Sequence, residues 1–165
     1  MVPADVDSVY RRHFPVIRAK CRRMLADAEE AQDVAQETFA RLCGAGLEGR
    51  DARQVIAWIY RTSTHLAVDL LRRRGVRPVA EAGSLDAVRN HPGHEDALAT
   101  RQLLVQCLKR LGAGELELLI LQRLDRMTQP QIALVLGTSE RTIRRRLLKL
   151  DQRLNRITTE LRHGP

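Results

Sequence analysis

The stretch TQPQIALVLGTSERTIRRRLLKLDQRLNRI, residues 128–157, decides how the C-terminal part of the chain folds. Thr128 is suited to cap the N-terminus of a short helix, whose first turn tolerates Pro130. Gly137 suits the left-handed conformation that ends a helix, and Ser139 can cap a second helix soon after it. Two short helices joined by a glycine-containing turn form a helix-turn-helix, so the sequence predicts this motif.

The second of these helices separates apolar from basic side chains. Its apolar residues recur at helical spacing and predict a buried seam of Ile143, Leu147, Leu150, Leu154 and Ile157. The opposite face carries Arg141, Arg144, Arg145, Leu148, Lys149 and Gln152. In a helix-turn-helix the early residues of the second helix enter the major groove, where arginine binds guanine and cationic groups neutralise phosphates. The pattern therefore favours duplex-DNA binding over its alternative, a solvated charged face on an ordinary helical hairpin.

The overall charge is compatible with a nucleic-acid partner. The chain has 28 lysines and arginines, 20 aspartates and glutamates, and a formal net charge of +8, which suits a polyanion. A GC-rich genome also raises the arginine content of solvated positions, so net charge alone does not decide between these explanations. Aromatic residues make up only 3% of the 165 residues, a composition that favours helices over strands.

The cysteines and the hydropathy of the sequence bear on location. Cys21, Cys43 and Cys107 are far apart and show no metal-binding spacing, so we expect reduced thiols. No apolar run approaches the ~20 residues that a membrane span requires, and no signal peptide opens the chain. The sequence therefore predicts a cytoplasmic protein that reaches a membrane only through a partner.

Residues 1–74 show helical periodicity throughout. Pro15 is predicted to break the first helix into two pieces, and Asp27 to cap the second helix. A glycine-containing loop at residues 44–49 precedes a third helix, predicted over residues 53–74. The predicted buried faces consist of Val6, Val9, Tyr10, Ile17, Cys21 and Met24, then Ala31, Val34, Ala35, Thr38, Phe39 and Leu42, then Ile56, Ile59, Tyr60, Ser63, Leu66, Ala67 and Leu70. Three amphipathic helices with short connections predict a small bundle.

From residue 75 to about residue 96 the helical pattern disappears. This segment contains glycines and prolines, lacks a periodic apolar face and is locally acidic, so we predict a linker. Helical periodicity then resumes, with apolar residues at Leu103, Leu104, Cys107, Leu108, Leu111, Leu116, Leu119, Ile120 and Leu124. The sequence thus predicts an all-α fold of two small domains, residues 1–74 and 97–165, joined by the linker 75–96.

Three patterns follow one another along the chain: DAEEAQDVAQETFARL at 27–42, AWIYRTSTHLAVDLLRRR at 57–74 and LGTSERTIRRRL at 136–147. Together they resemble the extracytoplasmic-function (ECF) group of bacterial RNA polymerase sigma factors. The first is similar to the polymerase-binding helix of region 2, the second to the promoter-melting helix that follows it, and the third to the region 4 recognition motif. Three matches in the family's order are not expected by chance.

The resemblance implies a role for each motif. The first would dock on the β′ clamp of core RNA polymerase through Asp33, Gln36 and Glu37, although acidic residues there also complement the helix dipole. The second would capture the −10 element as single-stranded DNA through Trp58, Arg61, Thr62, His65, Asp69 and Arg72. The third would read the −35 element as duplex through Arg141, Thr142, Arg144, Arg145, Leu148 and Lys149. Whether Trp58 belongs to the core or faces DNA stays open at this point.

The resemblance also implies partners. They are core RNA polymerase, contacted at its β′ clamp and β flap, promoter DNA, and an anti-sigma protein that could hold the chain at the inner membrane. The loop at residues 44–51 would contribute a pocket for an extruded base, and the linker would thread through polymerase channels. Neither a catalytic group nor a cofactor is implied.

The chain departs from the family pattern at several positions. His65 stands where the family usually has Asn, which puts base-specific capture there in doubt. Arg126 replaces a common Gly before the helix-turn-helix, and Gln129-Pro130-Gln131 replaces a more acidic stretch. The run TIRRRL is more basic than usual and favours phosphate affinity over sequence discrimination.

Two other classes of protein were weighed on the same residues. A dimeric helix-turn-helix regulator that acts without polymerase is the main alternative, but residues 1–74 suggest neither a dimerisation helix nor a ligand pocket. An enzyme would need a site for its chemistry, and His91 and His94 lie in the predicted linker with no third ligand at helical spacing. The sequence therefore predicts no catalytic site, no metal site and no enzyme activity.

Overall fold

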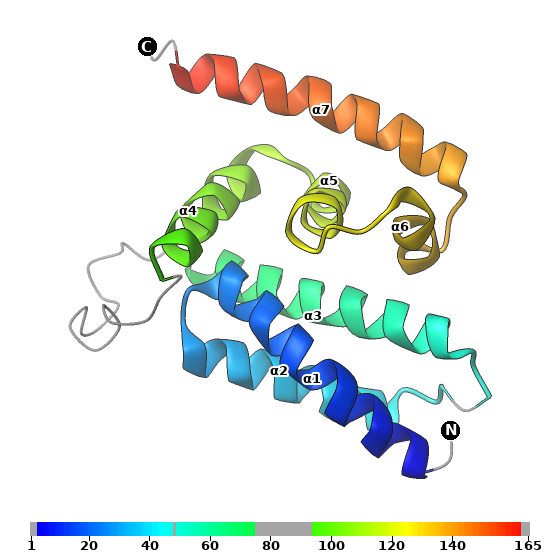
Figure 1. Ribbon diagram of the computed structural model, residues 1–165. Coiled ribbons are helices and arrows are strands. Elements are labelled where there is room, and N and C mark those ends of the chain that lie inside the picture. The colour runs from blue at the N-terminus through cyan, green and yellow to red at the C-terminus, as the bar shows by residue number, and fades with distance from the viewer. Residues whose placement is uncertain (1–2, 48, 75–93, 163–165) are drawn as a thin grey trace. The chain divides into compact units, whose positions relative to one another are not determined.

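The computed structural model describes residues 3–47, 49–74 and 94–162, and all regular elements within them are helices (Figure 1). The chain divides into two compact units, Met1–Gln106 and Cys107–Pro165. Helix α4 (His94–Arg110) runs through that boundary. The prediction of an all-α fold with two domains is confirmed. Most of the predicted linker, residues 75–93, lies outside the described residues, and its last three predicted residues belong to α4.

The first unit contains a bundle of α1 (Pro3–Leu25), α2 (Ala28–Gly44) and α3 (Ala52–Arg74), each of which contacts the other two (Figure 1). Three aromatic rings meet between α1 and α2. The Tyr10 ring stacks on Phe14 at 4.7 Å between centroids and meets Phe39 edge-on at 5.2 Å. The short connections and amphipathic helices predicted from the sequence therefore form the expected bundle.

Helix α1 continues through Pro15, so the predicted break at this residue is wrong. Proline removes one backbone hydrogen bond and crowds the preceding turn, which normally ends or kinks a helix. Here Pro15 is exposed, while Phe14 and Ile17 on the other face are buried in the bundle. Tertiary packing of the flanking residues outweighs the local preference, because most helical stability in proteins comes from a packed apolar face.

Helix α2 follows the sequence prediction closely. Asp27 caps it, since the backbone N–H of Glu30 donates to Asp27 Oδ1 over 2.9 Å. The six residues predicted to be buried are the buried residues of this helix: Ala31, Val34, Ala35, Thr38, Phe39 and Leu42. The only polar member is Thr38, whose hydroxyl donates to the Val34 carbonyl over 2.8 Å. Its buried hydroxyl is therefore hydrogen-bonded.

Helix α3 is buried over a wider face than predicted. Ile59, Ser63 and Ala67 are buried as expected. Four other predicted core residues are only half-buried: Ile56, Tyr60, Leu66 and Leu70. The buried set also includes residues not predicted: Val55, Ala57, Thr64, Val68 and Leu71. A helix that packs against two neighbours buries more than one narrow stripe of residues. The single apolar stripe predicted for α3 therefore missed part of its buried surface.

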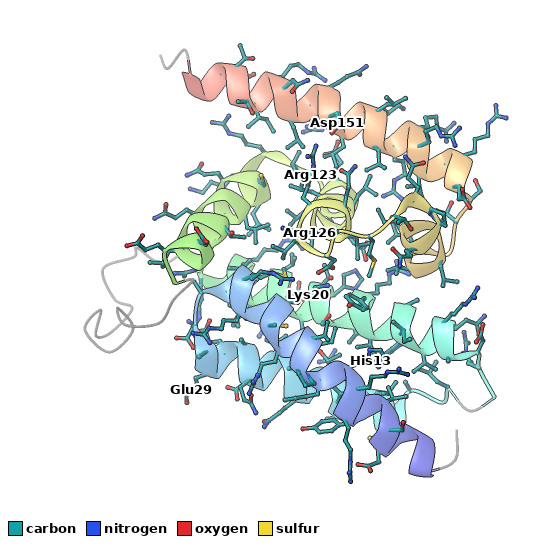
Figure 2. All side chains as sticks on the ribbon, in the orientation of Figure 1. His13, Lys20, Glu29, Arg123, Arg126 and Asp151 are labelled. Atoms are coloured by element: carbon teal, nitrogen blue, oxygen red, sulfur yellow. The ribbon has the colours of Figure 1, made fainter. Side chains whose placement is uncertain are left out.

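A lysine is buried between α1 and α3 (Figure 2). Lys20 is 1% exposed, and its Nζ lies 2.6 Å from Thr64 Oγ1 and 3.3 Å from the Tyr60 carbonyl oxygen. The ammonium also lies 5.0 Å from the centre of the Tyr60 ring, within the range of a cation–π contact. The helical pattern of α1 did not predict Lys20 in the core.

The second unit is built around a long C-terminal helix. Helix α5 (Ala113–Leu119) continues as the π-helical turn η2 (Ile120–Leu124), and α6 (Gln129–Leu136) and α7 (Glu140–Arg162) follow. Helix α7 contacts both α5 and α6. The buried apolar residues of this unit are Cys107, Leu111, Leu116, Leu118, Ile120, Leu121, Ile132, Ala133, Val135, Ile143, Leu147 and Leu150.

Candidate nucleic-acid interface

Helices α6 and α7 form the predicted helix-turn-helix. Thr128 precedes α6 in an extended conformation, and the Gln131 side chain accepts its backbone N–H over 2.8 Å. Ser139 caps α7, because its hydroxyl accepts the backbone N–H of Thr142 over 3.2 Å. Both predicted caps thus stand at the starts of their helices.

Gly137 makes the turn between the two helices. Its φ of 62° and ψ of 39° lie in the left-handed region, which side chains other than glycine adopt at a cost. The backbone N–H of Thr138 then donates to the Ala133 carbonyl over 3.0 Å, which satisfies one of the carbonyls left open at the end of α6. The turn therefore directs the chain straight into α7.

The apolar seam of α7 holds the helix on the second unit. Ile143, Leu147 and Leu150 are buried, and Leu154 and Ile157 farther along are half-buried. Since these residues recur at steps of three and four, the helix turns one face inward and leaves the other in solvent. The sequence predicted this division of faces correctly.

The outward face of α7 is strongly cationic. Arg141, Arg144, Arg145 and Lys149 are exposed, and within the described residues none makes a hydrogen bond or ion pair with another side chain. We call these four residues the basic face. Thr142, the other polar residue expected to read the −35 element, is half-buried and belongs to the cap with Ser139.

Two other arginines of α7 form hydrogen bonds with backbone carbonyls of the second unit. Arg146 donates to the Gly114 carbonyl over 3.2 Å, and Arg153 donates to the Arg110 carbonyl over 2.7 Å. Arg153 also pairs with the Glu115 carboxylate at 3.3 Å. The sequence pattern assigned Arg146 and Arg153 neither to the apolar seam nor to the outward face, and their helical spacing places them beside the seam.

Helix α2 has an exposed acidic surface. Asp33, Gln36 and Glu37, the residues expected to bind polymerase, are all exposed. Glu37 pairs with Arg41 one turn later at 2.7 Å. Glu30 pairs with Arg74 at the end of α3, so this carboxylate holds two helices together. Asp33 makes no ion pair with another described residue, so its carboxylate remains available to a basic partner.

Helix α3 presents the residues expected to capture single-stranded DNA on one side. Four of them are exposed: Arg61, His65, Asp69 and Arg72. Arg72 and Asp69 lie 3.9 Å apart as a loose ion pair. Trp58 and Thr62 are half-buried. Trp58 is thus neither a fully buried core residue nor a fully exposed one, which are the two alternatives that the sequence left open.

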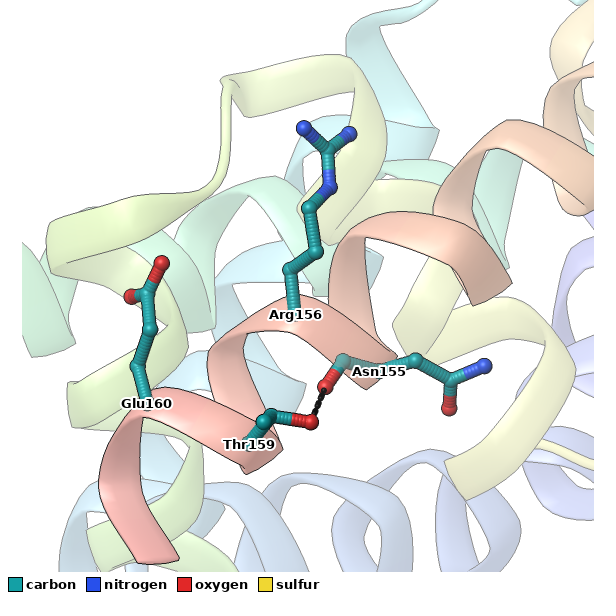
Figure 3. Close-up of a pocket in the computed structure, with 4 residues that line it drawn as sticks. All are labelled: Asn155, Arg156, Thr159 and Glu160. Atoms are coloured by element: carbon teal, nitrogen blue, oxygen red, sulfur yellow. Dashed lines mark hydrogen bonds between the residues drawn. The ribbon is translucent and has the colours of Figure 1, made fainter. Parts of the chain in front are cut away.

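A shallow hollow near the end of α7 is lined by Asn155, Arg156, Thr159 and Glu160, all from one helix, and the Thr159 hydroxyl already donates to the Asn155 carbonyl (Figure 3). Within residues 3–47, 49–74 and 94–162, no group of three His, Cys, Asp or Glu side chains could hold a metal ion. His91 lies outside this part of the chain, as does the side chain of His94. In the same part, every helix is too short or too polar to cross a membrane.

Comparison with known proteins agrees with this arrangement. Residues 9–77 match the family model of sigma-70 region 2, and residues 101–150 match that of sigma-70 region 4. The first match covers most of the helical bundle, and the second covers α6 and the part of α7 up to residue 150. The region 4 match begins inside α4, close to the predicted start of the second domain.

Whole-chain relatives extend the comparison. The chain is 30% identical over 149 residues to the ferric citrate uptake sigma factor FecI of Escherichia coli, covering 87% of this chain and 84% of the relative. It is 28% identical over 145 residues to the ECF sigma factor SigL of Mycobacterium tuberculosis, covering 85% and 81%. The solved structure of CnrH in complex with the cytosolic domain of CnrY has a similar fold, with a TM-score of 0.60 at 22% identity over 93% of this chain and 87% of that one. The chain therefore belongs to the ECF group of bacterial RNA polymerase sigma factors, the proteins that direct RNA polymerase to initiate transcription.

Proposed function

We propose that this sigma factor binds core RNA polymerase through α2 and reads the −35 element of its promoters, as duplex, through the basic face of α7. The observation that carries the proposal is the basic face itself. Its four cations have no side-chain partner among the described residues, while Arg146 and Arg153 are engaged in the fold. Cations that the fold does not use are suited to phosphates and to guanine in the major groove.

The contact with polymerase is assigned to α2. This helix carries four carboxylates, at Glu29, Glu30, Asp33 and Glu37, and a single arginine. Of the carboxylates, Glu30 pairs with Arg74. Asp33 and Glu37 lie exposed on the part of α2 that matches the family motif, where Glu37 also pairs with the exposed Arg41. An acidic surface of this kind suits a basic surface on the polymerase clamp.

The −10 element is assigned to α3, which would bind it as a single strand. The exposed Arg61 and Arg72 can neutralise phosphates. Trp58 is half-buried, so the accessible part of its ring can contact a base. Since aromatic residues are few, capture of bases that open transiently fits this helix better than an extended stacking platform. The loop at residues 44–51 would hold an extruded base.

An anti-sigma protein is part of the proposal. The related sigma factor CnrH has been solved in complex with the cytosolic domain of CnrY, and a partner of that kind would hold this chain inactive in the cytoplasm, at the inner membrane. In this scheme the chain acts as a regulator and performs no catalysis itself.

The test of the proposal is assembly with polymerase followed by transcription. The purified chain is mixed with core RNA polymerase, the complex is separated by gel filtration, and run-off transcripts are collected from a genomic library. We expect a stable complex and transcripts that share an upstream sequence. A protein that binds duplex DNA by itself and ignores the polymerase would instead be a helix-turn-helix regulator of the dimeric kind.

A further inference from the structure

Leu148 has its side chain in solvent, on the outward side of α7. It is 61% exposed, more than any other large hydrophobic residue of the described chain, where Val16 follows at 47% and Leu134 at 44%. The seam that attaches α7 consists of other residues, so Leu148 adds nothing to the core. A single exposed leucine by itself carries no meaning. Its neighbours are what make this one informative.

The neighbours of Leu148 are cations. Arg144 and Arg145 lie one helical turn before it, and Lys149 follows it directly. Residues three and four apart share a helix face, so Leu148 lies within the basic face. An apolar protein surface that covered Leu148 would also have to desolvate these charges without neutralising them, which is unfavourable. Duplex DNA neutralises them and also offers an apolar group in its major groove, the C5 methyl of thymine.

We propose that Leu148 reads the C5 methyl group of a pyrimidine in the duplex that the basic face binds. The inference rests on the proposed function and extends it by assigning one chemical feature of the promoter to one side chain. Leucine cannot donate or accept a hydrogen bond, so its discrimination comes from the contact area that the methyl group adds. Thymine carries this methyl in ordinary DNA and 5-methylcytosine carries it in methylated DNA.

The experiment removes the methyl group and nothing else. Duplexes that the full chain selects in complex with core polymerase are resynthesised with each thymine in turn replaced by uracil. We expect one position at which uracil weakens binding by about three- to fivefold, the effect of withdrawing one methyl-sized apolar group from contact. The Leu148→Ala variant should bind the original duplex more weakly and should no longer distinguish thymine from uracil at that position.

Two controls sharpen the result. Leu134→Ala removes another exposed leucine of the same unit and should keep the response to uracil. Cytosine at the sensitive position, compared with 5-methylcytosine there, tests whether the methyl group restores binding whichever base carries it.

The possible outcomes test the proposed role of Leu148 and the proposed function separately. The inference is overturned if uracil has no effect at any position, or if Leu148→Ala keeps the response of the unmodified chain. A Leu148→Ala variant that binds every duplex normally also overturns it and points to a protein partner for this leucine. If no duplex is enriched at all, the proposed function itself fails.

Discussion

A residue in a strained conformation stands just before the helix-turn-helix. Arg126 has a φ of 53°, in the left-handed region, and the other non-glycine residue with positive φ in the described chain is Ala26 at 57°. Left-handed φ costs an ordinary residue ~1–2 kcal/mol. Glycine is the residue that the family resemblance leads us to expect at this position, and the arginine that replaces it has a measurable physical consequence.

Replacing Arg126 with glycine should therefore stabilise the protein. The gain from relieved strain is partly offset by the larger unfolded-state entropy of glycine, ~0.5–1 kcal/mol, so we expect a net increase of about 0.5–1 kcal/mol in the free energy of unfolding. Urea denaturation measures it. Arg126→Ala, which loses the same side chain but keeps the strain, is the matched control, and a glycine variant no more stable than the alanine variant would contradict the account.

His13, on α1 (Figure 2), should make the stability of the protein depend on pH. Burial lowers the pKa of His13 below its ordinary value of 6.5, and the nearby Arg12 lowers it further. The folded protein therefore holds this imidazole neutral at pH values where the unfolded chain has begun to bind a proton. Its contribution to stability is present above pH 6.5 and is lost as the pH falls below that value.

The His13→Gln variant should lack this dependence. We expect the unfolding free energy of the unmodified chain to fall relative to that of the variant between pH 7.5 and pH 5.5, values chosen about one unit to either side of the ordinary histidine pKa. Since both proteins share every other histidine, their difference isolates His13. Parallel stability curves would show that the histidine titrates alike in the folded and unfolded chain.

At the scale of the element, sequence reasoning succeeded where local chemistry determines the structure. The caps at Asp27 and Ser139, the left-handed turn at Gly137 and the buried seam of α7 each follow from a few neighbouring residues. The failures lie where tertiary packing decides. Burial of the flanking residues carries α1 through Pro15, and contact with two neighbouring helices widens the buried face of α3.

The same reason limited the prediction of the site. The sequence identified the outward side of α7, but it did not show which arginines form hydrogen bonds within the second unit. Arg146 and Arg153 reach carbonyls of Gly114 and Arg110, residues more than thirty positions away in the chain. Periodicity within a single helix cannot reveal a partner that distant.

The turn between α6 and α7 allows a prediction at this scale. A Cβ at Gly137 would meet no atom within 4 Å, so substitution costs backbone strain alone. We expect Gly137→Ala to lower the free energy of unfolding by about 1 kcal/mol, and Gly137→Asn by less, because asparagine adopts left-handed φ more readily. Thermal unfolding of the two variants checks the order. Equal stability of all three proteins would mean that the turn relaxes out of this conformation.

At the scale of the whole molecule, the two units carry surfaces of opposite charge. The exposed carboxylates of α2 belong to the first unit and the basic face of α7 to the second. A protein organised in this way should divide its tasks, with polymerase bound by one unit and duplex DNA by the other. Variants of each surface should then fail in one task only.

The most direct test measures both affinities, for core polymerase and for promoter duplex, in two variants and their charge-matched controls. Arg144→Ala should weaken promoter-specific duplex binding by ~1–3 kcal/mol and leave polymerase binding unchanged, with Arg156→Ala as its control. Glu37→Lys should weaken polymerase binding and spare the duplex contact, with Glu160→Lys, an equal charge change on α7, as its control. If either variant damaged both affinities equally, the assignment of separate tasks to the two units would be wrong.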